Sequence, residues 1–93
     1  MTIRLSYGTV RHTPRKAIFA LRIHDVLLEP LEIEEIAERM RERLALRGEL
    51  TAEVVVFQGD TKETLRLYGN SYAANLVRTA VFNMAISWSA IDL

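Results

Sequence analysis

Few residues of this chain have the types and spacing that catalysis or metal binding requires. Its two histidines, His12 and His24, lie twelve positions apart, with no cysteine in the chain and no paired carboxylate at ligand spacing. Each is interpreted as a solvent-facing imidazole, because a general base or a zinc site needs partner groups held nearby. The four glycines are too scattered for a phosphate loop, and no serine has the neighbours of a nucleophile elbow. The sequence therefore predicts a protein that is not an enzyme and that holds no metal or cofactor.

A short basic segment at residues 11–16 is the feature that best suits nucleic acid. Lysine and arginine neutralise phosphates without reading sequence, so Arg11, Arg15 and Lys16 are candidate RNA contacts. The alternative is the soluble tip of a hairpin, because no aromatic residues alternate with the basic ones to stack on bases. The whole chain has twelve basic and twelve acidic residues, so its net charge does not steer it toward nucleic acid or an anionic membrane.

Length and composition predict one domain, residues 1–93, with a single core. The chain has 93 residues, of which 49% are apolar, enough for one modest core and too few for two. The absence of cysteine excludes a disulfide framework, so a reducing cytoplasm is the simplest setting. No run approaches the roughly eighteen apolar residues of a membrane span, and the N-terminal residues contain no apolar signal segment. We expect a cytoplasmic protein without membrane contact.

The first quarter of the chain has the pattern of a β-hairpin. Residues 2–10 and residues 17–26 each alternate between apolar and polar side chains, as half-buried strands do. The histidine, threonine and proline at residues 12–14 interrupt this pattern. The two strands are therefore predicted to pair, and the loop between them is the basic one.

A helix and a third strand are predicted next. Pro30 followed by acidic residues is typical of a first helical turn, and Gly48 is well placed to end the helix. Its apolar stripe consists of Ile33, Ile36, Ala37, Met40 and Leu44. Residues 51–57 are rich in β-branched side chains and predict a central strand with both faces at least partly covered.

The last third of the chain has an apolar stripe at steps of three and four, which predicts one long helix over residues 61–91. The stripe consists of Leu65, Tyr68, Gly69, Tyr72, Ala73, Leu76, Val77, Ala80, Val81, Met84, Trp88 and Ile91. Asp60 and Glu63 have the spacing of a capping box that would begin this helix. A helix of about thirty residues would be roughly 45 Å long, so part of it should contact a partner.

A second interpretation stays open, in which residues 63–68 and 84–91 are strands. Gly69 would then be a turn, and Asn70 or Ser71 would cap a shorter helix. With the long helix, the fold is α+β: a small antiparallel sheet of about three strands with two helices on one face. With the additional strands, the fold is ferredoxin-like, βαββαβ with an extra N-terminal strand. Such a homodimeric module would bind a small ligand or RNA through its sheet.

A short motif follows the third predicted strand. It consists of Leu65-Arg66 and, after three further residues, Asn70-Ser71-Tyr72. In this position the motif resembles the small dimerisation subunit of the KEOPS tRNA-modification complex, the cancer/testis-antigen-like family, over roughly residues 50–82. The resemblance implies a compact α+β domain whose helices cover one face of an antiparallel sheet. It also implies a non-catalytic subunit that dimerises and docks a kinase-like catalytic subunit, which makes threonylcarbamoyl-adenosine on tRNA.

The partner surface is predicted on the C-terminal helix. Its candidate residues are Arg66, Asn70, Ser71, Tyr72, Leu76, Phe82 and Ile86. Asn70 and Ser71 lie beside Arg66 in a polar patch that can form hydrogen bonds with a partner. Phe82 and Ile86 lie off the main stripe, and burial by a partner would explain their apolar character. The partner is either a second copy or another protein, with the kinase-like subunit as the candidate that the resemblance implies; contact with tRNA is expected to be indirect.

Overall fold

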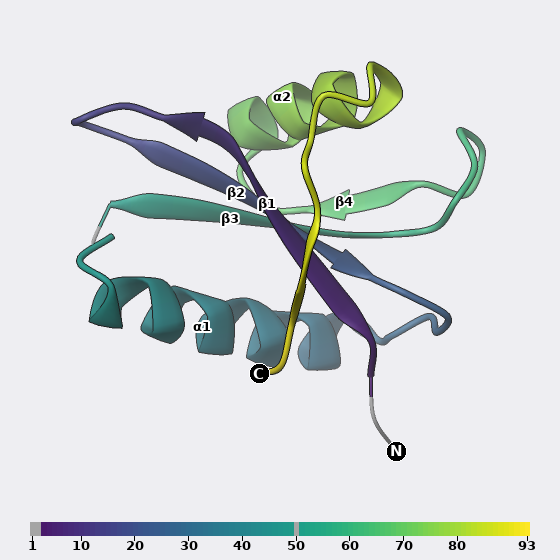
Figure 1. Ribbon diagram of the computed structural model, residues 1–93. Helices are drawn as coiled ribbons and strands as arrows, with labels where there is room; N and C mark the ends of the chain where they lie inside the picture. Colours follow the sequence, from purple (N-terminus) through teal and green to yellow (C-terminus); the bar gives the residue numbers. More distant parts are fainter. Residues whose placement is uncertain (1–2, 50) are drawn as a thin grey trace.

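A computed structural model of the chain describes residues 3–49 and 51–93 (Figure 1). Over these residues the elements are, in order, β1 (Leu5–His12), β2 (Ala17–Ile23), α1 (Pro30–Leu46), β3 (Ala52–Gln58), β4 (Arg66–Tyr68), α2 (Ser71–Phe82) and β5 (Ser89–Ile91). The strands form one sheet in the spatial order β4-β3-β2-β1-β5. The predicted α+β class is confirmed, and the sheet has five strands where about three were expected.

β1 and β2 form the predicted hairpin. They pair antiparallel along their lengths, with a shift in register between Thr9 and Arg11. Thr2, where the sequence predicts the first strand to begin, lies outside the described residues. The connecting loop is closed by Thr13, whose hydroxyl accepts a hydrogen bond from the Lys16 N–H at 3.0 Å. β2, which the sequence predicted to be half-buried, is buried at every residue except Arg22, because its two faces belong to the cores on the α1 and α2 sides.

α1 lies where the sequence predicts it. The helix begins at Pro30, which suits a first turn because it needs no partner for an N–H, and it ends at Leu46, before Gly48 with φ +91°. The Glu29 N–H donates to the Glu32 carboxylate at 3.2 Å and so satisfies one group at the start of the helix. The buried stripe is the predicted one: Ile33, Ile36, Ala37, Met40 and Leu44.

β3 lies beside β2 and runs parallel to it. α1 carries the chain back along the sheet, and a helical connection of this kind returns the next strand in the same direction. The sheet is therefore mixed, and the prediction of an antiparallel sheet is wrong at this pair of strands. The predicted coverage of β3 on both faces is confirmed: Val54 and Val56 are buried on the α1 side, and Val55 and Phe57 on the α2 side.

The two helices cover opposite faces of the sheet (Figure 1). The core on the α1 side includes Phe19, Leu21, Ile36, Met40, Leu44, Val54 and Val56. The core on the α2 side consists of Ile18, Ala20, Val55, Phe57, Ala73, Val77 and Ile86. The prediction of two helices on one face is wrong, because the central strands are apolar on both sides and each side needs its own cover.

Residues 61–91 are not one helix. They contain β4, the 12 residues of α2, and β5. A helix over all of them would be roughly 45 Å long, whereas the longest dimension of the molecule is 34 Å. Gly69, with φ +150°, breaks the helical pattern, and a Cβ at this position would lie 3.1 Å from the Val54 oxygen. Neither of the two helices in the described residues is long and apolar enough to cross a membrane.

α2 is capped by Asn70, and the predicted capping box at Asp60 and Glu63 is wrong. The Asn70 Oδ1 accepts hydrogen bonds from the N–H groups of the second and third helical residues, at 3.0 and 3.2 Å. This is the usual contact of an N-cap side chain. The segment after Asp60 forms a turn instead, in which the Thr61 and Thr64 hydroxyls lie 2.8 Å apart.

The element order agrees with the alternative interpretation, but the arrangement does not. The chain has a βαββαβ unit preceded by one strand. In a ferredoxin-like fold, the two parallel strands of each βαβ unit are separated by another strand, whereas β2 and β3 are hydrogen-bonded neighbours. The ferredoxin-like arrangement is therefore wrong. A helix packs against each face of the sheet, and the binding of RNA or a small ligand through the sheet stays a prediction.

A short segment, residues 83–88, carries the chain from α2 across the sheet to β5. It crosses β1 at Gly8, where a Cβ would overlap the Ile86 side chain and lie 3.0 Å from the Ser87 oxygen. The Trp88 ring packs against the Phe57 ring, with 5.4 Å between their centres. β5 then pairs antiparallel with β1 at the edge of the sheet. The missing side chain at position 8 is therefore what lets this segment lie close to the sheet.

Candidate functional site

Two of the predicted RNA contacts meet Tyr72, a predicted partner contact. The Arg11 guanidinium donates to the Tyr72 hydroxyl at 2.9 Å, and the Lys16 ammonium lies 5.6 Å from the centre of the Tyr72 ring. The Tyr72 side chain is 55% exposed. We define Arg11, Lys16 and Tyr72 as the loop cluster. It forms because the β1–β2 loop lies beside the start of α2, although 61 positions separate Arg11 from Tyr72 in the sequence.

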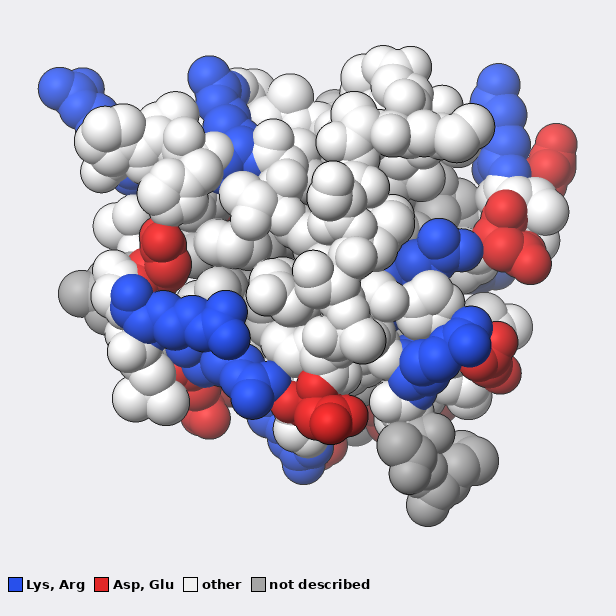
Figure 2. Space-filling view, viewed as in Figure 1, with Lys and Arg blue, Asp and Glu red and all other residues white. Residues whose placement is uncertain are grey.

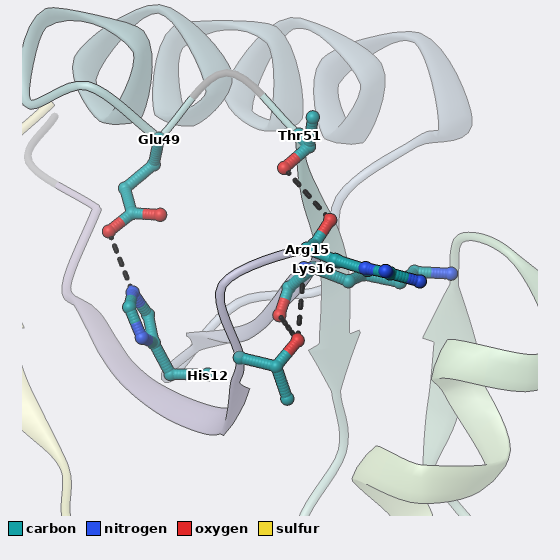
Figure 3. A network of polar contacts seen from close by, with 6 residues as sticks. His12, Arg15, Lys16, Glu49 and Thr51 are labelled. Atoms are coloured by element: carbon teal, nitrogen blue, oxygen red, sulfur yellow. Dashed lines mark hydrogen bonds and ion pairs between the residues drawn. The ribbon is translucent and has the colours of Figure 1, made fainter.

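The loop of the third predicted RNA contact, Arg15, is tied to the chain that follows α1 (Figure 3). His12 Nε2 lies 2.9 Å from Glu49 Oε1, and the Thr51 hydroxyl donates to the Arg15 carbonyl at 3.3 Å. Figure 3 shows the Arg15 and Lys16 side chains extending away from these contacts. The basic side chains of the loop are therefore presented from a backbone that is held on one side.

The two histidines lie at opposite ends of the hairpin. His12 ends β1 beside the loop, and His24 follows the far end of β2. Burial is the main cause that lowers the pKa of His24 below its ordinary value of 6.5. The charges of Arg22 and Arg4 lower this pKa further, and Asp25 opposes them. Over residues 3–49 and 51–93, no three histidine or carboxylate side chains are grouped so that they could hold a metal ion.

Most of the predicted partner contacts lie near the two ends of α2. Asn70 and Ser71 begin the helix, and Arg66 precedes it on β4; all three are exposed. Leu76 is half-buried and packs against the core on the α2 side. Phe82 ends the helix and is 47% exposed. Eleven helical steps, roughly 17 Å at 1.5 Å per residue, separate Ser71 from Phe82.

Ile86, which was also a predicted partner contact, lies inside the chain. It is 8% exposed and belongs to the core on the α2 side, above Gly8. A continued helix would place it on a free face. Because α2 ends at Phe82 and the chain then crosses the sheet, Ile86 is buried within the monomer and is not available to a partner.

Met84 is an exposed residue that the sequence predicted to lie on the apolar stripe of a long helix. Its side chain is 90% exposed, and its φ is 50°. The Met84 N–H donates to the Val81 carbonyl at 3.1 Å, and the Ala85 N–H donates to the Ala80 carbonyl at 2.9 Å. These two bonds form a Schellman motif, in which glycine is the usual residue at the left-handed position. Any residue with a side chain costs on the order of 1 kcal/mol there.

Two segments without a charged residue lie side by side. They are residues 5–10, mostly in β1, and residues 79–91, which end in β5. The pairing of β1 with β5 joins them. Figure 2 shows the result as a broad region at the centre of the view that is free of Lys, Arg, Asp and Glu. We define the exposed residues of these two segments as the uncharged face. Charged residues are depleted from the centres of protein interfaces, so this face suits a protein contact.

A hollow of 330 Å³ opens beside Phe82 and Met84. Its apolar lining consists of Phe57, Leu65, Val81, Phe82 and Met84. Polar groups, among them Arg22 and Asp60, line the remainder. A hollow of this composition can accept an apolar side chain of a partner, which is the usual anchor at the centre of an interface.

Comparison with known proteins does not add to this description. The chain has no match among protein-family models and no significant match among curated proteins or solved structures. The resemblance to the KEOPS subunit therefore rests on the short motif. The arrangement that it implied, with helices on one face of an antiparallel sheet, differs from the mixed sheet with a helix on each face.

Proposed function

We propose that the chain is a non-catalytic assembly module that forms a homodimer through the uncharged face. The observation that carries this proposal is the exposure of Met84 together with its backbone conformation. Its apolar side chain is almost fully exposed at a backbone position where glycine would be less strained. In the isolated chain no burial offsets this strain. In a dimer, burial of the side chain would contribute roughly 1.5–3 kcal/mol, which exceeds the cost.

A second copy of the chain is the partner that the charge distribution favours. In a two-fold symmetric interface the same patch is used on both sides, so a patch of one charge sign would repel itself. The uncharged face has no such conflict, since Arg78 and Asp92 are the charges that border its longer segment. A stable dimer needs roughly 800 Å² from each copy, about an eighth of the 6257 Å² accessible surface.

Light scattering coupled to size-exclusion chromatography tests this proposal. Met84→Glu and Phe82→Glu place a charge in an apolar contact, so both variants should be monomeric where the wild type is dimeric. Leu46→Glu is the matched control, because Leu46 is also 90% exposed but lies at the end of α1. Circular dichroism shows whether each variant keeps its fold.

The oligomeric states of the wild type and the variants decide whether the uncharged face forms the dimer. A dimeric wild type and a dimeric Leu46→Glu variant, together with folded monomers of Met84→Glu and Phe82→Glu, support the proposal. A wild type that stays monomeric at every concentration contradicts it. A dimer that both face substitutions leave intact contradicts it as well, because the contact would then lie elsewhere.

The loop cluster favours a second candidate function, the binding of RNA. Arg11 and Lys16 converge on an exposed tyrosine, and this combination of basic and aromatic groups suits a nucleic-acid strand. The resemblance implies that this RNA is a tRNA. Membership of a cytoplasmic tRNA-modifying complex with a kinase-like subunit stays a prediction. Lys16→Gln should weaken the binding of tRNA, measured by fluorescence anisotropy, and lower its salt slope by about one. Arg47→Gln, at the end of α1, is the control. Equal affinities for Lys16→Gln and the wild type would contradict this function.

A further inference from the structure

A second candidate site lies at the carboxyl ends of β2 and β3. Among the described strands, these two are the hydrogen-bonded pair that runs parallel, and their last residues, Ile23 and Gln58, lie opposite each other. After β2 the chain continues to α1 on one face; after β3 it continues through β4 to α2 on the other face (Figure 1). Because these strands are parallel neighbours, the loops that follow them meet at the same end of the sheet.

A groove of 420 Å³ lies at this place. Its polar lining consists of Arg4, Arg22, His24, Asp25 and Asp60, beside the backbone of Gly59. The volume is within the range of roughly 300–1,000 Å³ that small-molecule sites occupy. Figure 2 shows positive and negative side chains close together at the right-hand end of the molecule, where these strands end. Such a lining, with arginine donors and aspartate acceptors, fits a polar ligand that has both acceptor and donor groups.

Arg22 is the residue best placed to bind a ligand in the groove. The carbon of its guanidinium lies 5.8 Å from the centre of the Phe57 ring. Arg4 is paired with Asp25 at 3.3 Å, whereas the Arg22 side chain has no hydrogen-bond or ion-pair partner within residues 3–49 and 51–93. An aromatic ring positions the guanidinium while its N–H donors stay free. Those donors match the oxygens of a phosphate or carboxylate group.

His24 lines the groove together with Arg4 and Arg22. Its Nε2 lies 2.8 Å from the Ser6 hydroxyl. Apart from burial, Arg22 and Arg4 each lower the pKa of His24 by more than Asp25 raises it. The two arginines of the groove therefore lie close enough to act on the charge of this imidazole, and they would attract a bound anion.

We propose that this groove binds a small hydroxylated molecule through an oxyanion, either a phosphate or a carboxylate, that the Arg22 guanidinium holds. The exposed Asp60 carboxylate, on the loop that follows β3, accepts hydrogen bonds from the hydroxyl groups of the same molecule. This pairing explains why a groove for an anion also contains a carboxylate. The inference goes beyond the dimer proposed above; the groove adjoins the hollow beside Phe82 and Met84 and shares Arg22 and Asp60 with it.

Nuclear magnetic resonance tests the inference with three probes at constant ionic strength: ribose 5-phosphate, gluconate and ribose. An oxyanion ligand should produce saturating shifts at Gly59, Asp60 and the His24 ring, and leave the distant His12 ring unchanged. It should also raise the pKa of His24, because a bound anion offsets the arginine charges. A response to ribose 5-phosphate alone identifies the anion as a phosphate, and a response to gluconate alone identifies it as a carboxylate.

Three variants assign the binding to Arg22. Arg22→Gln should weaken binding roughly tenfold or more, as expected for loss of hydrogen bonds to a charged group. Arg22→Lys keeps the charge and loses the planar fork, so it should retain part of the affinity. Arg78→Gln, an exposed arginine on α2 outside the groove, should bind as the wild type does.

The inference is overturned if neither anion shifts the groove, if ribose shifts it equally, or if the shifts occur at the loop cluster instead. It is also overturned if Arg22→Lys binds as tightly as the wild type and Arg22→Gln does so too. Where Arg22→Gln fails to fold by circular dichroism, the wild-type shift map and the Arg22→Lys affinity decide.

Discussion

At the scale of single residues, Met84 combines backbone strain with almost complete exposure of an apolar side chain. Met84→Gly should therefore raise the free energy of unfolding of the monomer, by up to about 1 kcal/mol, because glycine adopts the left-handed conformation without a steric cost. The same change should weaken the dimer, since it removes the side chain that the second copy buries. Urea denaturation at low protein concentration measures the first effect, and light scattering measures the second. A less stable Met84→Gly monomer would contradict the role of strain.

His24 gives the chain a dependence on pH whose sign follows from its lowered pKa. Its pKa in the folded chain lies below 6.5, so the unfolded chain binds the proton more readily. The stability that neutral His24 contributes is therefore complete above pH 6.5 and is lost as the pH falls through the lower pKa of the folded state. Urea denaturation over a series of pH values should show this loss in the wild type and a flatter profile in His24→Gln. Identical profiles would show that His24 is not its source.

At the scale of elements, the start of α2 depends on one side chain. Asn70→Ala should lower the free energy of unfolding by about 0.5–2 kcal/mol, the usual cost of a lost N-cap, because the Asn70 Oδ1 accepts two backbone hydrogen bonds. Asp60→Ala is the matched control and should change stability little, since Asp60 caps no helix. Thermal denaturation compares the two. A larger loss for Asp60→Ala would restore the capping box at Asp60 and a helix that begins there.

The segment between α2 and β5 depends on the absence of a side chain at Gly8. Gly8→Ala should lower the free energy of unfolding by about 1–3 kcal/mol, because the added Cβ overlaps Ile86 in a packed core. It should also loosen the contact between Trp88 and Phe57. Trp88 is the chain's one tryptophan, so its fluorescence should shift to longer wavelength.

Gly48→Ala controls for this experiment, because nothing lies within 4 Å of a Cβ at Gly48. Its φ of +91° makes that variant somewhat less stable as well. The tryptophan emission should stay unchanged in Gly48→Ala. Equal emission shifts in the two glycine variants would mean that the segment over Gly8 is not held by close packing.

At the scale of the whole molecule, stability and association are coupled if the chain dimerises. The melting temperature of the wild type should then rise with protein concentration, and that of Met84→Glu should not, because a dimer stabilises the folded state by mass action. The dimer should also respond little to salt, since its face carries no charge. Binding of tRNA at the loop cluster should instead weaken steeply as salt rises. Calorimetry and anisotropy at two salt concentrations separate the two surfaces.

Local patterns in the sequence determined the first half of the fold. The alternation in the hairpin, Pro30 and Gly48 around α1, and the β-branched run of β3 each act over a few residues, so each could be interpreted without knowing the fold. The covered faces of β3 were predictable for the same reason. The coverage of opposite faces by two helices follows from those apolar faces, although both helices were expected on one face.

The tertiary structure alone decided the second half of the chain and the candidate sites. The stripe over residues 61–91 is shared by β4, α2, the crossing segment and β5, and one backbone conformation at Gly69 separates them. The exposure of Met84, the contact of Arg11 with Tyr72 and the stacking of Arg22 on Phe57 all join residues through the folded chain. Periodicity records which residues are apolar, but which surface each one meets depends on contacts between distant segments, and only folding brings those segments together.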